Sequence, residues 1–249
     1  VQLARGPWTM LLCRRDRRVV GRMLVGIDEI YNLENNCRSA WFSLFECEQD
    51  NEAAAMLFEA CIEWARQQGA DKLHGPESPD ASDSFRGILV MGFDGPPALL
   101  NNYNPPWYRD FFEQAGFEKN LDLFAYSFNT SQIIEAKKDQ VIQYAMHRYA
   151  YHVDCLDLKN LERDLRDIHA VLARTIPLFE GERMAVPTLA DIERLAEGML
   201  PIADPDLVCI ARTNDGNQPI GLVVALPDYN LVFRHIRDGR LLPVGWLKL

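Results

Sequence analysis

The amino-acid sequence predicts an α/β protein built around a mixed sheet. Its 249 residues, 48% hydrophobic and 25% charged, suffice to bury a sizeable core in one large or two small domains. Residues 39–75 indicate strand, helix and strand with short connections, a unit whose two strands pair in parallel. An amphipathic helix over residues 104–116 opens with an asparagine and two prolines and stops at a glycine, a common way for a helix to pass into a strand.

The first strands form a predicted hairpin. Aliphatic and β-branched residues fill positions 8–14 and 19–27, on either side of the charged turn RRDRR at 14–18. A polar loop over 28–38 leads to a strand over 39–48. The next helix has apolar residues every 3.6 positions, with Asp50 or Asn51 as N-cap and Gly69 as its stop. A short strand over 71–75 closes the unit.

Residues 76–103 interrupt this rhythm. The segment is rich in Pro, Gly, Asp and Ser, yet it carries the apolar run GILVMGF. A connection of this length is often a lid or a binding loop, and the alternative is a loop packed by its own apolar residues. After the helix that ends at Gly116, a loosely alternating run up to residue 128 predicts another strand.

The second half predicts a different order of elements. Residues 129–149 read as a helical connector, followed by a strand, two helices and a hairpin whose turn contains Asp-Gly. This order would precede the first hairpin if both halves share one plan and the front of the first is missing. The predicted domains are therefore 1–128 and 150–249, joined by the connector, and the two hairpins should correspond.

Composition excludes several classes of protein. A net charge of -10 argues against nucleic acid as a partner, because phosphate binding needs a basic surface. No apolar run approaches the roughly 20 residues of a bilayer-spanning helix, and the start lacks signal-peptide anatomy, so we expect a cytoplasmic protein without membrane contact. The six cysteines are scattered without metal-ligand spacing, which predicts reduced core thiols and no metal site. A first residue other than Met suggests that the natural start lies outside this sequence.

Two segments carry a resemblance to a known family. FECEQDNEAAAMLFEACIEWARQQGADKLHG and NPPWYRDFFEQAGFEKNLDLFAY keep the spacing of elements in the GNAT superfamily of N-acyltransferases. The resemblance implies α-β-α layers in two copies of that fold, the first lacking its front and the second its back. It also implies transfer of an acyl group from acyl-coenzyme A, as co-substrate, to an amine of a small molecule or peptide. The sequence leaves open whether the protein forms a homodimer.

The coenzyme A loop is the first site that the resemblance implies. In the family, a Q/R-x-x-G-x-G/A loop and a helix N-terminus hold the pyrophosphate through backbone amides. The corresponding cofactor-binding residues here are Cys47, Gln49, Asp50, Asn51, Glu52, Ala53 and Ala54. Glu52 replaces the middle glycine, and its carboxylate would repel a pyrophosphate. The alternative is that these residues only cap the helix.

The helix over 104–116 supplies the second implied site. The family places a tyrosine four residues before the closing glycine, where its hydroxyl can protonate the leaving thiolate. That position is Phe112 here, so we predict Tyr108, one turn earlier on the same face, as the general acid. The alternative is that the aromatic residues of this helix only cover the sheet.

A base and a binding surface complete the predicted site. Glu46 and Glu48 alternate onto one face of the strand and could raise one another's pKa, as suits a base, although a solvated strand end is the alternative. Tyr103, Asn104 and Trp107 form an expected rim for an amine or peptide-like ligand. The competing class of function is a non-catalytic relative that binds a small ligand or a partner segment.

Overall fold

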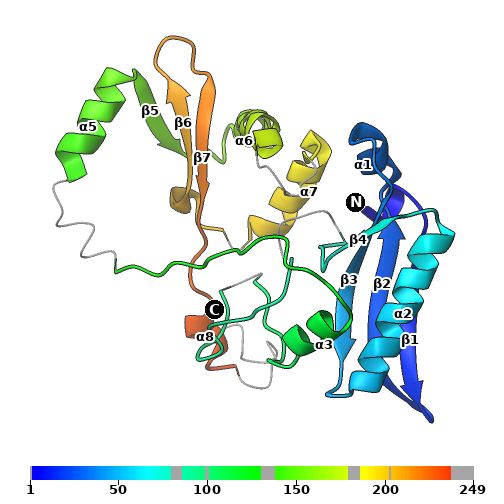
Figure 1. Ribbon diagram of the computed structural model, residues 1–249. Helices are drawn as coiled ribbons and strands as arrows, with labels where there is room; N and C mark the ends of the chain where they lie inside the picture. Colours follow the sequence, from blue (N-terminus) through cyan, green and yellow to red (C-terminus); the bar gives the residue numbers. More distant parts are fainter. Residues whose placement is uncertain are drawn as a thin grey trace. The chain divides into compact units, whose positions relative to one another are not determined.

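The computed structural model is a mixed α/β protein with two sheets (Figure 1). It describes residues 2–79, 86–98, 101–129, 138–178, 186–201 and 203–236. The backbone contacts divide the chain into two compact units, which are described separately. Unit 1 comprises Val1–Lys119 with Asp228–Leu249, and unit 2 comprises Asn120–Pro227. In the described part of the chain, no helix combines the length and apolar character needed to cross a bilayer.

Unit 1 contains a four-stranded sheet in the order β1-β2-β3-β4. The strands are β1 (Trp8–Arg15), β2 (Arg18–Ile27), β3 (Ser39–Cys47) and β4 (Lys72–His74). The first two pairings are antiparallel and the third is parallel, which confirms the predicted hairpin and crossover. The turn of the hairpin lies at Asp16, whose φ of 56° is one that Asp adopts more readily than most residues.

One long helix covers a face of this sheet. The helix α2 (Asn51–Gln67) begins after the N-cap Asp50, as predicted, and the chain turns at Gly69, with φ 82°. Its buried positions are Ala53, Ala54, Leu57, Phe58, Cys61 and Ala65. These side chains face apolar residues of β2 and β3, so the 3.6-residue stripe in the sequence forms the centre of the unit's core.

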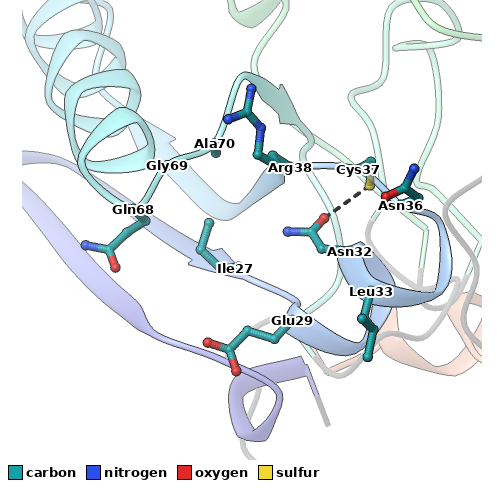
Figure 2. Close-up of a pocket in the computed structure, with 10 residues that line it drawn as sticks. All are labelled: Ile27, Glu29, Asn32, Leu33, Asn36, Cys37, Arg38, Gln68, Gly69 and Ala70. Carbon is teal, nitrogen blue, oxygen red and sulfur yellow. Dashed lines mark hydrogen bonds between the residues drawn. The ribbon is translucent and has the colours of Figure 1, made fainter.

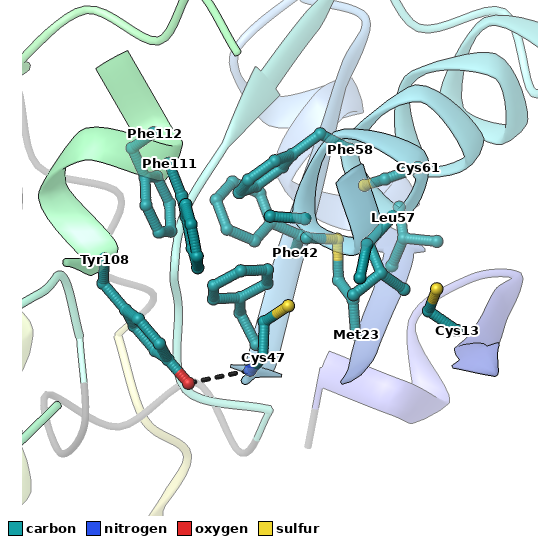
Figure 3. Packing of buried hydrophobic residues seen from close by; sticks show 14 of the residues in the cluster. Cys13, Met23, Phe42, Cys47, Leu57, Phe58, Cys61, Tyr108, Phe111 and Phe112 are labelled. Carbon is teal, nitrogen blue, oxygen red and sulfur yellow. Dashed lines mark hydrogen bonds between the residues drawn. The ribbon is translucent and has the colours of Figure 1, made fainter. Parts of the chain in front are cut away.

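An aromatic cluster extends that core to the short helix α3 (Tyr108–Gln114), as Figure 3 shows. Phe112 lies 5.1 to 5.8 Å, between ring centroids, from four phenylalanines. These are Phe42, Phe45, Phe58 and Phe117. Tyr108 and Phe111 are buried beside it, so the aromatic residues of this helix do cover the sheet. Phe112, at the position where the family has a tyrosine, is therefore a core residue.

Two segments of the first half differ from the sequence prediction. The expected polar loop over 28–38 contains the helix α1 (Glu29–Glu34). Asp28 is its N-cap, because its side chain accepts a hydrogen bond from the Tyr31 amide. The expected strand over 117–128 carries no strand pairing in the described residues. Leu123 and Phe124, neighbours in sequence, are 61% and 67% exposed, so neither alternate face is buried.

Part of the long loop, residues 86–98, is anchored by asparagine side chains. Asn102 donates to the carbonyls of Arg86 and Gly87, and Asn104 exchanges hydrogen bonds with the backbone of Leu89. The Asn230 side chain, in α8 (Asn230–Phe233), donates to the Pro97 carbonyl at 2.8 Å. The predicted lid at 76–103 also includes residues 80–85 and 99–100, which lie outside the described part.

Unit 2 contains a three-stranded antiparallel sheet in the order β5-β6-β7. Its elements are α5 (Lys138–Arg148), β5 (Tyr151–Cys155), α6 (Leu161–Thr175), α7 (Leu189–Met199), β6 (Val208–Thr213) and β7 (Pro219–Val224). Three short 3-10 turns, Gln2–Ala4, Ile176–Leu178 and Pro205–Leu207, complete the described elements of the chain. The order of a strand, two helices and a hairpin is as predicted, whereas the domain limits and the duplication stay predictions.

A buried arginine is the main polar feature of unit 2. Val208, Ile210 and Arg212 alternate along β6 as its buried positions. The Arg212 guanidinium binds three carboxylates at 2.7 to 3.1 Å: those of Asp154, Asp164 and Asp167. Arg212 and Asp164 are both fully buried, whereas the Asp154 side chain is partly exposed, so this network joins β5, β6 and α6 from the core to the surface.

Candidate active site

The carboxyl-terminal half of β3 is the structural basis of the candidate site. Within the described part of unit 1, β3 pairs with β4 only from Ser39 to Trp41. One further hydrogen bond, from the Glu77 amide to the Phe42 carbonyl at 2.8 Å, follows before β3 and the segment after β4 separate. Ligands of open α/β sheets often bind beyond the carboxyl ends of strands where the chains separate.

A β-bulge changes the direction in which the side chains of this half of the strand point. Leu44 and Phe45 together oppose the single residue Met23 of β2, and Leu44 has φ 50°. Beyond the bulge, Phe45 and Cys47 point into the core, whereas Leu44 and Glu46 are exposed. The bulge therefore places the Glu46 side chain on the exposed side of the strand.

Tyr108 meets Glu46 at the end of β3. The Tyr108 hydroxyl donates to Glu46 Oε2 at 3.0 Å and accepts the Cys47 amide at 2.8 Å, the second of these bonds being drawn in Figure 3. Burial raises the pKa of Tyr108, and the neighbouring Glu46 carboxylate raises it further. The phenol is therefore protonated at neutral pH. Two of the three predicted catalytic residues lie in direct contact.

Glu48, the third predicted catalytic residue, binds a different partner. Its carboxylate accepts a hydrogen bond from Arg18 at 2.5 Å, so Glu46 and Glu48 have different partners. Arg15 binds Asp50 at 2.7 Å and Glu52 at 3.0 Å. The turn RRDRR thus faces the acidic loop at the start of α2. The predicted repulsion by Glu52 is offset by the Arg15 guanidinium, which binds the same carboxylate.

The first turn of α2 is capped by the side chain of Asp50. Asp50 Oδ1 accepts a hydrogen bond from the Ala53 amide at 3.1 Å. This hydrogen bond is the main cause that lowers the pKa of Asp50, and the Arg15 guanidinium is the next. Gln49 and Asn51 are exposed, and Ala53 and Ala54 are buried against the sheet. Burial raises the pKa of the Cys47 thiol to about 11, so this sulfur is not a thiolate at neutral pH.

An aromatic pocket joins the three predicted substrate-binding residues. A pocket of about 390 Å³ is lined by Phe93, Tyr103, Asn104, Pro105, Pro106 and Trp107. The Asn104 amide already binds the backbone of Leu89 through both of its polar atoms, so it shapes the wall. Trp107 also packs against the aromatic cluster that contains Tyr108. The pocket therefore lies at the start of the helix that carries the candidate acid.

A larger cavity lies at the other end of β3 (Figure 2). It measures about 670 Å³ and is lined by the end of β2, α1, the end of α2 and residues 36–38. Its Cys37 thiol donates to Asn32 at 3.2 Å, and the nearby Arg38 binds Asp71 at 2.8 Å. Because the length of β3 separates this cavity from Glu46 and Tyr108, we place the candidate active site at the carboxyl end.

Three features of the structure were not predicted from the sequence. No partners were predicted for the arginines of the hairpin turn, yet Arg15 and Arg18, which stay exposed, bind acidic residues around the start of α2. The acidic segment ECEQDNE opposite a basic turn was the available signal. The bulge at Leu44 had no sequence signal. Arg212 could have been found as a charge at a buried position of an alternating strand.

Comparison with known proteins gives two curated relatives, and no family model matches the chain. Protein YghO of Escherichia coli (strain K12) is 25% identical over 248 residues, covering 97% of this chain and 60% of that protein. The bacterial ceramide synthase of Caulobacter vibrioides (strain NA1000 / CB15N) is 28% identical over 242 residues, covering 96% and 61%. The chain thus spans about three fifths of the length of these relatives.

Solved structures are also similar to this chain. Among them is a GCN5-related glucosamine N-acetyltransferase region in a fungal multi-domain GH3 β-N-acetylglucosaminidase. The match covers 89% of this chain and 23% of that one, with 16% identity and a TM-score of 0.43.

Proposed function

We propose that this chain is part of an N-acyltransferase that moves an acyl group from acyl-coenzyme A to an amine. The observation that carries the proposal is the contact of 3.0 Å between the Tyr108 hydroxyl and the Glu46 carboxylate. A group that keeps its proton and a group that can accept one are adjacent at the carboxyl end of β3. Similarity to a bacterial ceramide synthase supports the same class, because a ceramide is an amide of a fatty acid.

Acyl-coenzyme A would bring its pyrophosphate to the loop before α2. Arg15 and Arg18 lie there, but Arg15 already binds Asp50 and Glu52, and Arg18 binds Glu48. The helix N-terminus adds amides that suit an anion, although the Asp50 carboxylate occupies the Ala53 amide. A pyrophosphate would therefore have to displace these carboxylates from the arginines. When bound, the thioester supplies an activated acyl group and a good leaving group.

The two catalytic residues divide the proton transfers. The substrate ammonium first loses one proton to solvent. Glu46 then takes a second proton from the amine nitrogen as it attacks the thioester carbonyl, and the C–S bond breaks as the C–N bond of the amide forms. Tyr108 gives its proton to the departing sulfur. The bond between the two side chains then returns a proton from Glu46 to Tyr108, which restores the starting state. The Cys47 amide, which donates to the Tyr108 oxygen, holds the phenol in place.

The acceptor is an amine, and the relative suggests which amine to test first. A ceramide synthase acts on a sphingoid base, a long-chain amino alcohol. The pocket lined by Tyr103 and Trp107 offers aromatic faces for a cation or an alkyl chain. We therefore rank a sphingoid base above small polar amines as the acceptor.

The test measures amide formation by the purified chain. Acetyl- and palmitoyl-coenzyme A are each offered with sphinganine or with a small polyamine, and thiol release is followed together with product mass. We expect turnover with at least one pair and a loss of roughly 10²- to 10⁴-fold in Glu46→Gln, which keeps an acceptor for Tyr108 but cannot take a proton. Glu48→Gln is the matched control. Equal losses in both variants would contradict the role of Glu46.

A binding module is the second candidate, and two observations favour it. Phe112 is a core residue without a hydroxyl, and Asp50 occupies an amide that an anion would need. In this case the chain would bind its ligand through the aromatic pocket and release no thiol. Absence of turnover, combined with ligand binding that Trp107→Ala abolishes, would select this candidate.

A further inference from the structure

Cys155 and Cys209 face each other across two strands of unit 2. They are directly opposite in the antiparallel register of β5 and β6, which lie side by side in Figure 1. The Leu156 amide donates to the Val208 carbonyl at 2.9 Å, so that neighbouring pair is the hydrogen-bonded one. The cysteine pair is then of the non-hydrogen-bonded kind, in which Cα atoms approach to about 4.5 Å. Disulfides span Cα separations of roughly 4.4–6.8 Å.

The two sulfurs also converge on one backbone acceptor. The Cys155 and Cys209 thiols point to the Asp206 carbonyl at 3.8 and 3.7 Å. Both side chains therefore already adopt rotamers that bring their sulfur atoms together.

The pair lies on the open face of its sheet. The buried positions of β6 alternate with Cys209, so the cysteines point away from the core around Arg212. Cys155 is exposed, and the neighbouring side chains Val153 and Val223 are 48% and 62% exposed. By contrast, Cys13, Cys47 and Cys61 are buried, and Cys37 is bonded to Asn32. The expectation that all six cysteines are core thiols is therefore wrong for Cys155.

We propose that Cys155 and Cys209 form a reversible dithiol–disulfide pair, oxidised by a small disulfide of the glutathione class. The Cys155 thiolate attacks one sulfur of the oxidant and releases one thiolate. The Cys209 thiolate then attacks the sulfur of Cys155 in the mixed disulfide and releases the second. The two protein thiols lose two electrons and two protons, and the oxidant is reduced to two thiols.

Oxidation would tie β5 to β6 beside the buried network. Asp154, which binds Arg212, precedes Cys155 in β5, and the crosslink closes the chain segment that contains α6 and α7. An exposed cross-strand pair is of the kind that thiol exchange can open again. Desolvation, then the Cys209 thiol, and then the Asp206 and Asp154 carboxylates raise the pKa of Cys155, so oxidation should accelerate as the pH rises above neutrality.

The experiment equilibrates the folded chain with mixtures of oxidised and reduced glutathione at neutral and mildly alkaline pH. Free thiols are then trapped by alkylation, and peptides are mapped by mass spectrometry without reduction. Wild type should yield one crosslinked peptide pair, containing Cys155 and Cys209, which a reductant removes. Cys155→Ser and Cys209→Ser should instead carry one glutathione on the remaining cysteine, whereas Cys37→Ser, the control at a half-buried thiol, should crosslink like wild type.

A second measurement uses only the wild-type protein, so it does not depend on the folding of a variant. Thermal unfolding of oxidised and reduced wild type should show a higher Tm for the oxidised form, because the crosslink restricts the unfolded chain. A stable mixed disulfide at Cys155 without crosslinking would overturn the proposal. Two thiols that stay reduced at every ratio of oxidised to reduced glutathione would do the same.

Discussion

Tyr108 and Phe112 occupy successive turns of α3, and only one of them carries a hydroxyl. Phe112 is enclosed by phenylalanine rings, whereas Tyr108 reaches from the same core to the backbone and carboxylate at the end of β3. The Tyr108 phenol therefore lies at the end of this strand, whereas the Phe112 ring does not leave the core. The hydroxyl also satisfies the Cys47 amide, so removal of the oxygen leaves a buried donor unpaired.

Tyr108→Phe should lower kcat by roughly 10² to 10⁴, the usual range for one general acid, if the proposed chemistry holds. The same change should cost about 1–3 kcal/mol of folding stability, because the Cys47 amide loses its partner. Steady-state kinetics and urea unfolding measure the two effects separately. Tyr149→Phe, at an exposed tyrosine, is the control for both. Turnover within twofold of wild type would remove Tyr108 from the mechanism.

Glu52 provides a test of the loop before α2. Glu52→Gly should tighten coenzyme A binding up to about fivefold, because removing one like charge at about 5 Å gains roughly 1 kcal/mol in a water-like dielectric. The change also releases an Arg15 hydrogen bond for the ligand. Calorimetry compares this variant with Glu52→Gln and with Glu63→Gln, further along α2. Unchanged or weaker binding would mean that the loop only caps the helix.

At the scale of elements, the packing of β2 beside β3 depends on Gly26, because the absence of a side chain there leaves room for the Trp41 ring. A Cβ on Gly26 would lie 2.5 Å from the ring of Trp41, which is fully buried and cannot yield. Gly26→Ala should therefore cost about 1–3 kcal/mol by overpacking. Gly198 in α7 has no neighbour within 4 Å of such an atom, so Gly198→Ala should stabilise by up to about 1 kcal/mol. Urea unfolding that shows the same sign for both would contradict this account.

The Arg212 network makes a second prediction at this scale. Arg212→Met leaves the fully buried Asp164 carboxylate without its main cation, and loss of one buried partner costs about 3–5 kcal/mol. Arg166→Met is the control, because Arg166 forms an exposed pair with Glu162, worth less than about 1 kcal/mol. Denaturant midpoints measure both. Equal, small shifts would show that water or Arg163, which also binds Asp164, replaces the lost guanidinium.

Acid stability belongs to the whole molecule, because both units contain carboxylates with lowered pKa values. The Ala53 amide lowers the pKa of Asp50, the Asn160 side chain that of Asp157, and the Thr188 hydroxyl that of Asp191. The unfolded chain binds these protons more readily, so their stabilisation is complete above the ordinary value of 3.8. It is lost as the pH falls through the lower folded values.

We therefore expect a Tm that changes little down to about pH 5 and falls steeply below about pH 4. Asp191→Asn should flatten part of that fall, because the amide does not titrate, although it weakens the capping box of α7. Scanning calorimetry over this pH range checks both statements. A fall in Tm that begins near neutral pH would point to histidines as the controlling groups.

Much of the fold is predictable from local sequence, and much less of the site is. The hairpins, the parallel crossover and the helices α2, α6 and α7 follow from periodicity and capping residues, all of which act over a few positions. The predicted strand after Gly116 pairs with no other strand among the residues that the structure describes, because its alternation predicts a strand without predicting a partner edge. Glu46 and Tyr108 were both predicted, but their contact was not.

By itself, the sequence determined most of the order of the elements, the cap of α2 and the residue types available for proton transfer; α1 and the unpaired segment after Gly116 were the exceptions. Only the tertiary structure decided which distant side chains meet. Tyr108 and Glu46 are 62 positions apart, and Arg15 and Asp50 are 35 apart. The physical reason is that helices and turns arise from neighbouring residues, whereas such contacts depend on strand register and on the bulge at Leu44. These features arise when the whole sheet assembles.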